Sequence, residues 1–157
     1  MKTGTQVSNR LVYLSCLMDK EVILTDEESD QRLSNEMRSF IESELTSQGD
    51  LLPVWMRYPQ IPRYSIGWRM GEGEYYMLAW NCWADGMERE QLVRYFKRYL
   101  PIPQEWIDWV ADRLGFPDVS DAIFSGEGGI DDVQWLEEKG LVNYLEFKVW
   151  FENREDQ

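Results

Sequence analysis

The chain has no histidine and two cysteines among its 157 residues, so it holds few side chains that exchange protons or act as nucleophiles near neutral pH. Basic residues are also scarce: 16 Lys and Arg stand against 29 Asp and Glu, a net charge of −13. No apolar run approaches the roughly 20 residues that span a membrane. These absences argue against a familiar catalytic centre, and against nucleic acid or an anionic membrane as the partner.

The scarcity of cysteine bears on the cellular compartment. Cys16 and Cys82 could form a disulfide in principle, but two cysteines in a chain without a signal-peptide pattern predict reduced thiols. We therefore expect a cytoplasmic location. Glu127, Asp131 and Asp132 surround glycines without the ligand spacing of an EF-hand loop, so the sequence predicts no metal site. No motif predicts a cofactor.

Negative charge is concentrated toward the C-terminus. Residues 101–157 hold four Lys and Arg against fourteen Asp and Glu, whereas residues 51–100 hold seven against five. An acidic surface attracts lysine and arginine and repels phosphate groups. The charge distribution therefore predicts a basic protein as the partner, with no direct binding of nucleic acid or membrane.

Length and apolar patterning predict the fold. A chain of 157 residues that is 43 % hydrophobic suits a single compact domain over 1–157, with disordered ends at about 1–8 and 153–157. The apolar spacing predicts helices at 26–47, 74–84, 87–99, 103–114, 120–125 and 131–139. Extended or alternating patterns predict strands at 10–18, 52–58, 63–70 and 142–151. We therefore expect an α+β fold, a small antiparallel sheet packed by several helices.

Residues 55–83 form the most distinctive segment. They hold four of the eight tryptophans and three arginines at six-residue spacing, Arg57, Arg63 and Arg69. If the segment forms a strand hairpin, alternate residues share a face and the three guanidinium groups align. With Trp68, Trp80 and Trp83 they would then line a pocket, since guanidinium groups stack on rings and bind carboxylate or phosphate. The alternative is that the rings are core and Arg69 pairs with Glu72 or Glu74.

The glycine-rich turn at residues 71–74 offers two chemical interpretations. A strand that turns on glycines into a helix can present backbone amides to an anion. The glycine spacing of phosphate-binding loops is absent, however, and Glu72 and Glu74 place negative charge where a phosphate would bind. Two carboxylates beside aromatic rings could instead serve a sugar hydrolase.

A second aromatic candidate lies further along the chain. Trp106 and Trp109 are three residues apart on one predicted helix, beside Glu105, Asp108 and Asp112. Aromatic anchors with an acidic rim would suit capture of a basic protein surface. The alternative is a core stripe whose opposite face is solvated.

Together these features predict a small acidic, non-enzymatic binding protein that neutralises a basic, nucleic-acid-handling partner. Immunity proteins against nuclease toxins and phage inhibitors of defence enzymes share this size and charge, an analogy of type alone. The alternatives are a pocket for an anionic nucleotide and a carboxylate-based hydrolase; the oligomeric state is left open. The candidate binding residues are Arg57, Arg63, Trp68, Arg69, Glu72, Glu74, Trp80, Trp83, Trp106 and Trp109.

Overall fold

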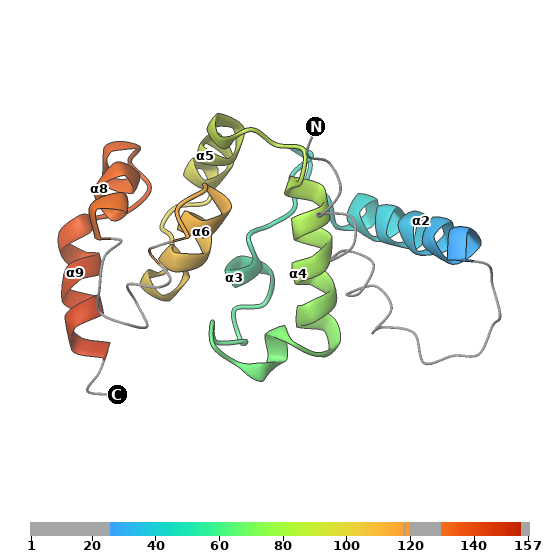
Figure 1. Ribbon diagram of the computed structural model, residues 1–157, viewed down its shortest axis with the longest axis horizontal. Helices are drawn as coiled ribbons and strands as arrows, with labels where there is room; N and C mark the ends of the chain where they lie inside the picture. Colours follow the sequence, from blue (N-terminus) through green and yellow to red (C-terminus); the bar gives the residue numbers. More distant parts are fainter. Residues whose placement is uncertain (1–25, 118, 120–129, 155–157) are drawn as a thin grey trace. The chain divides into compact units, whose positions relative to one another are not determined.

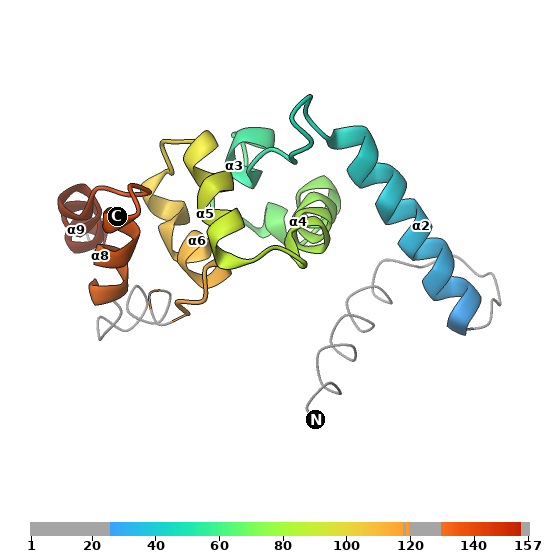
Figure 2. The ribbon, with the colours of Figure 1, turned by 90° about the horizontal axis from the view of Figure 1, so that it is seen from above.

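The computed structural model describes residues 26–117, 119 and 130–154. The chain divides into two compact units, Met1–Ser43 and Glu44–Gln157. In the first unit the described residues form helix α2 (Asp26–Glu44), which confirms the predicted helix but ends three residues earlier (Figure 2). The turn that follows accounts for this end, because the Thr46 amide donates to the Asp50 carbonyl at 2.8 Å. The strand predicted at 10–18 lies outside the described residues.

The second unit is helical wherever the structure describes it. The α+β expectation is therefore wrong: the described residues contain no sheet, and none of the strands predicted at 52–58, 63–70 and 142–151 is formed. The elements are α3 (Val54–Arg57), the 3-10 helix η1 (Ile66–Trp68), α4 (Gly71–Ala84), α5 (Arg89–Arg98), the 3-10 helix η2 (Gln104–Trp106), α6 (Ile107–Arg113), α8 (Ile130–Glu138) and α9 (Tyr144–Asn153).

Local hydrogen bonds replace the two central strands. The carbonyl of Pro53 accepts from the amides of Met56 and Arg57 at 2.9 and 3.0 Å, which closes the single turn of α3. In the second predicted strand, the Ser65 hydroxyl accepts from the Gly67 amide at 3.1 Å and begins η1. Proline fixes φ and serine offers the backbone a local partner, so both segments turn where an extended pairing was expected.

The last predicted strand is helix α9. Asn143 caps it, because its side chain accepts from the Glu146 amide at 3.1 Å. The alternating pattern predicted Leu145, Phe147 and Val149 on one face. The helix instead buries Phe147 and leaves Leu145 and Val149 exposed, because residues four apart share a helical face and those two apart do not.

The other helices of this unit were predicted correctly in position. The helix predicted at 74–84 begins at Gly71, the one at 87–99 is α5, and the one at 131–139 is α8. The helix predicted at 103–114 is η2 followed directly by α6, and the one at 120–125 lies outside the described residues. Among the described helices, none is both long enough and apolar enough to cross a membrane.

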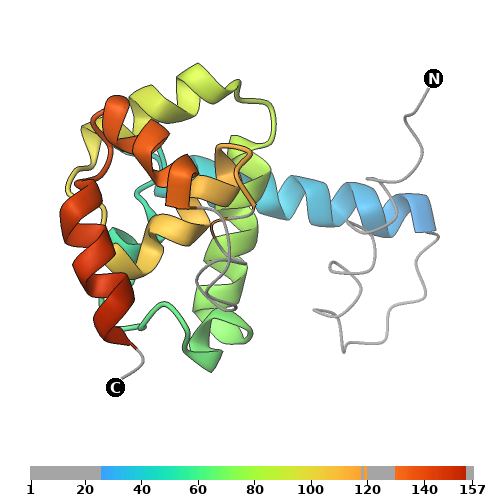
Figure 3. The same cartoon turned by 60° about the vertical axis from the view of Figure 1, so that its left-hand side comes forward.

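Helix α6 lies at the centre of the second unit. In Figure 1 and Figure 2 α5 and α6 lie between α4 on one side and the pair α8 and α9 on the other, and in Figure 3 α8 and α9 are turned toward the viewer. The five residues of α6 from Ile107 to Ala111 are all buried. α6 contacts α8, α9 contacts η2, and η1 contacts the start of α4. Segments far apart in sequence therefore meet around α6.

Candidate functional site

The predicted aromatic residues form the core of the second unit. Trp68, Trp80, Trp106 and Trp109 are all buried, and Trp55 joins them. We call these five residues the tryptophan cluster. The ring centroids of Trp80 and Trp109 are 4.5 Å apart, and those of Trp68 and Trp106 are 5.2 Å apart in a T-shaped arrangement. Such contacts add stability beyond the area they bury, so these rings hold the fold together and do not serve as exposed anchors.

Trp83 lies at the edge of this core. It is half-buried, and its ring packs against Trp80 at 6.1 Å and against Tyr95 at 5.1 Å. The sequence predicted Trp83 and Trp106 in two separate candidate sites. The structure joins them through Trp80 and Trp109, but as packing contacts inside the protein.

The three evenly spaced arginines have separate surroundings. Arg57 donates to Glu44 through Nε at 2.6 Å and lies over the Tyr58 ring at 4.7 Å. Arg63 donates to Asp108 at 3.1 Å. Arg69 is exposed and makes no ion pair with any described residue. The alignment expected from a strand hairpin is absent because the hairpin is absent.

Glu72 and Glu74 lie in the first turn of α4. Glu72 is exposed and Glu74 is half-buried. Carboxylates at this end of a helix interact favourably with its positive dipole, which gives both residues a structural role. The described residues contain no group of three or more acidic or sulfur ligands that could hold a metal ion.

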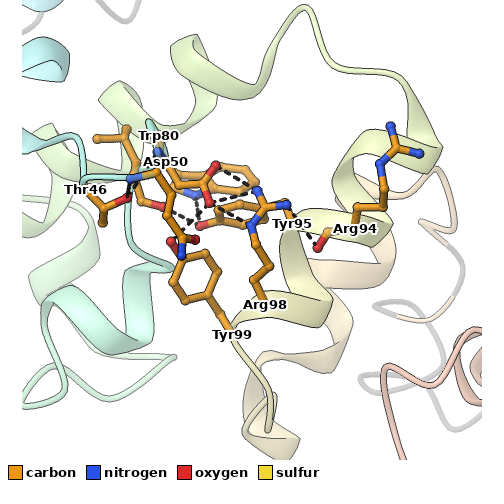
Figure 4. Close-up of polar contacts among 9 residues, drawn as sticks. Thr46, Asp50, Trp80, Arg94, Tyr95, Arg98 and Tyr99 are labelled. Carbon is orange, nitrogen blue, oxygen red and sulfur yellow. Dashed lines mark hydrogen bonds and ion pairs between the residues drawn. The ribbon is translucent and has the colours of Figure 1, made fainter.

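Asp50 is the centre of a fully satisfied polar network between the 46–51 segment and α5 (Figure 4). Its carboxylate accepts from Arg98 Nε and Nη2, both at 2.8 Å, and from the Tyr99 hydroxyl at 3.2 Å. Beside it the Tyr95 hydroxyl accepts from Trp80 Nε1 at 2.9 Å and donates to the Leu51 carbonyl at 2.8 Å. Every buried group in this network has a partner, so the network holds the 46–51 segment against α5.

The ion pair of Arg63 and Asp108 is different, because it is buried and incompletely hydrogen-bonded. The Asp108 side chain is 1 % exposed, and the Arg63 guanidinium lies 5.0 Å from the Trp106 ring. Arg63 Nε, Asp108 Oδ1 and the Gln104 amide oxygen have no hydrogen-bond partner among the described residues. Burial raises the pKa of Asp108, while the Arg63 charge opposes that rise. Buried polar atoms normally have partners, so these three atoms are exceptions among the buried groups of the second unit.

The chain beside this pair carries an exposed surface. Tyr64, Ile66 and Met70 are large side chains that are 54 %, 69 % and 57 % exposed, and Arg69 is exposed between them. We call these four residues the loop surface. Burial raises the pKa of the Tyr64 hydroxyl to about 12, and the charges of Asp108 and Glu105 raise it further while Arg63 and Arg154 lower it. The Arg63 guanidinium lies 5.2 Å from the centre of the Tyr64 ring, so this side chain borders the Arg63 and Asp108 pair.

The loop surface was missed by sequence reasoning, apart from Arg69. The expected strand hairpin placed the three arginines on one face and singled out neither Tyr64 nor Ile66, which are exposed in the structure. A signal was available, because Pro59, Pro62 and Ser65 favour turns over a continuous strand.

The chain was compared with protein families, with curated proteins and with solved structures, and none of them matches it.

Proposed function

We propose that this chain is a non-enzymatic binding protein that associates with a basic protein partner, one that handles nucleic acid, and blocks it in a stoichiometric complex. The observation that carries the proposal is the net charge of −13, and of the carboxylates whose burial is described only Asp50 and Asp108 are buried. Such a surface competes with the phosphate backbone for a groove lined by lysine and arginine.

The described carboxylates support this proposal. Glu72, Glu138 and Glu146 are exposed, and none makes an ion pair with a described residue. Three arginines behave differently, since Arg57, Arg63 and Arg98 each bind a carboxylate of the same chain. Each pair neutralises one positive and one negative charge, so the excess of 29 Asp and Glu over 16 Lys and Arg is unchanged by them.

The anionic nucleotide site has less support. Arg57 and Arg63 already bind Glu44 and Asp108, so an incoming phosphate would compete with carboxylates that are part of the fold. The hydrolase alternative depends on Glu72 and Glu74, which lie in the first turn of α4, Glu72 exposed and Glu74 half-buried. Neither alternative explains why acidic residues outnumber basic residues by 29 to 16.

The test is capture on the immobilised protein from a cell lysate at low and high salt. We expect basic proteins at low salt and a steep loss as salt rises, because exposed charges are screened over about 8 Å at physiological ionic strength. A captured protein is then purified and titrated with the chain. Inhibition that reaches a plateau at a fixed molar ratio supports the proposal, and recovery of DNA or RNA as the main bound species overturns it.

The enzyme alternative is tested with the same preparation. Glu72→Gln and Glu74→Gln each remove a base while nearly keeping the side-chain shape. If a substoichiometric amount of the protein consumes a nucleotide or a sugar, and either substitution abolishes this without unfolding the chain, the enzyme interpretation replaces the proposed function.

A further inference from the structure

We propose that the loop surface, formed by Tyr64, Ile66, Arg69 and Met70, is where the basic protein partner docks. This inference rests on the proposed function for the class of partner, and it adds the place and the chemistry of the contact. The occupant is a protein face that presents lysine or arginine side chains around an apolar centre.

Exposure and rigidity support this assignment. Three large apolar side chains are more than half exposed within seven residues, which is an unusual density for the surface of a soluble domain. The backbone beneath them is held by the Ser65 cap and by Trp68, whose Nε1 donates to the Pro62 carbonyl at 2.9 Å. A preorganised loop loses little conformational entropy when it binds, so more of the contact energy appears as affinity.

The charges at the border of the surface select the occupant. Three carboxylates near this surface make no ion pair with described residues: those of Glu72, Glu74 and Glu105. Glu72 is exposed and follows Met70 by two residues. The charges of Glu105 and Asp108 raise the pKa of the Tyr64 hydroxyl and those of Arg63 and Arg154 lower it, but Arg63 is already paired with Asp108. Arg69 is the one exposed cation of the loop surface itself. Acidic side chains around an apolar centre suit a basic partner and disfavour nucleic acid.

Helix α9 provides a matched comparison within the same chain. Leu145 is 69 % exposed, the same fraction as Ile66, and Val149 lies one helical turn further along. Lys148 pairs with Glu152 beside them at 3.9 Å, so part of the local charge is internally neutralised. The two apolar sites therefore differ in position and in charged surroundings, while the exposure of the central side chain is equal.

The experiment uses a synthetic amphipathic peptide of leucine and lysine as the probe, titrated into the full chain with labelled isoleucine, leucine, valine and methionine methyl groups. We expect saturable shifts of the Ile66 and Met70 methyl signals. Ile66→Asp should weaken peptide binding by about tenfold or more, as for a residue central to an interface, while Leu145→Asp should change it less than about twofold. Both side chains are exposed, so both variants should keep wild-type tryptophan fluorescence.

The outcomes separate the two proposals. Shifts centred on Leu145 and Val149, an equal loss in both variants, or no saturable binding overturns the loop surface as the docking site. If the peptide binds at Ile66 and Met70 but the lysate yields no basic protein, the docking site stands and the proposed class of partner fails. If a captured basic protein binds Ile66→Asp as tightly as the wild type, the proposed function stands and the docking site fails.

Discussion

Gly73, in the first turn of α4, lies directly against the main-chain carbonyl oxygen of Gly67 in η1. A Cβ atom built on Gly73 would collide with that oxygen, and it would also come within 3.1 Å of the Ile61 side chain. Two backbone segments therefore touch where neither carries a side chain. This contact sets the position of η1, and with it the display of Ile66 and Met70.

The first prediction follows from that contact. Gly73→Ala should lower the free energy of unfolding by about 1 to 3 kcal/mol, because the clash with fixed backbone outweighs the better helix propensity of alanine. Urea unfolding followed by tryptophan fluorescence measures this. Gly86→Ala is the control, since nothing lies within 4 Å of its added Cβ, and it should change stability by less than about 0.5 kcal/mol. Equal effects in the two variants would contradict the close packing of η1 on α4.

The second prediction concerns Asp50, which accepts three hydrogen bonds from Arg98 and Tyr99. Asp50→Asn should lower the free energy of unfolding by about 1 to 2 kcal/mol, because the charge-assisted hydrogen bonds to a buried carboxylate are lost. The loss is limited because the Arg98 guanidinium can be solvated instead. The matched change is Asp112→Asn, which breaks the more exposed pair with Arg113 and should cost less than about 1 kcal/mol. Thermal and urea unfolding of both variants decide the matter, and a larger loss at Asp112 would be inconsistent with the observed burial.

The third prediction tests the buried hydrogen bonds of Tyr95. Tyr95→Phe leaves Trp80 Nε1 without its acceptor and the Leu51 carbonyl without its donor, in the core of the second unit. Each buried group left without a hydrogen bond costs about 1 to 3 kcal/mol. We therefore expect the free energy of unfolding to fall by at least about 2 kcal/mol, although phenylalanine keeps the aromatic ring. A change below about 0.5 kcal/mol would mean that these two hydrogen bonds are not made. Urea denaturation of the variant and the wild type at one pH is sufficient.

The fourth prediction is a dependence on pH that arises from Asp108. Its pKa is raised above 3.8 by burial, so the folded protein holds the proton more tightly than the unfolded chain. This group therefore favours folding most at low pH, and its contribution falls as the pH rises from about 3.8 through the folded pKa. The stability of the wild type relative to Asp108→Asn should decrease across that range. Urea unfolding of both proteins at several pH values tests the sign, and a relative stability that increases with pH would refute it.

Much of the helical structure was predictable from the sequence, because its signals are local. In α4 the residues Tyr76, Trp80 and Trp83 recur at helical spacing, and in α5 the apolar residues lie on one face between a polar start and a proline-rich end. The strand predictions were wrong because local helix-capping and turn signals competed with the alternating apolar pattern and were given too little weight. Asn143 can cap a helix, and the turn residues around Ser65 can satisfy the backbone without a partner strand.

The candidate site could be predicted in composition but not in arrangement. Nothing in local spacing brings Arg63 to Asp108, because the two lie 45 positions apart and meet only when α6 packs at the centre of the second unit. The same packing decides that Trp106 and Trp109 are interior residues while Tyr64 and Ile66 face solvent.

The sequence by itself determined the absence of histidine, the charge of −13 and most of the helical periods, since these depend on residue identity and short-range spacing. The tertiary structure alone decided which aromatic side chains are exposed and which charges are neutralised. Burial and ion pairing are properties of neighbours that chain folding brings together from distant positions.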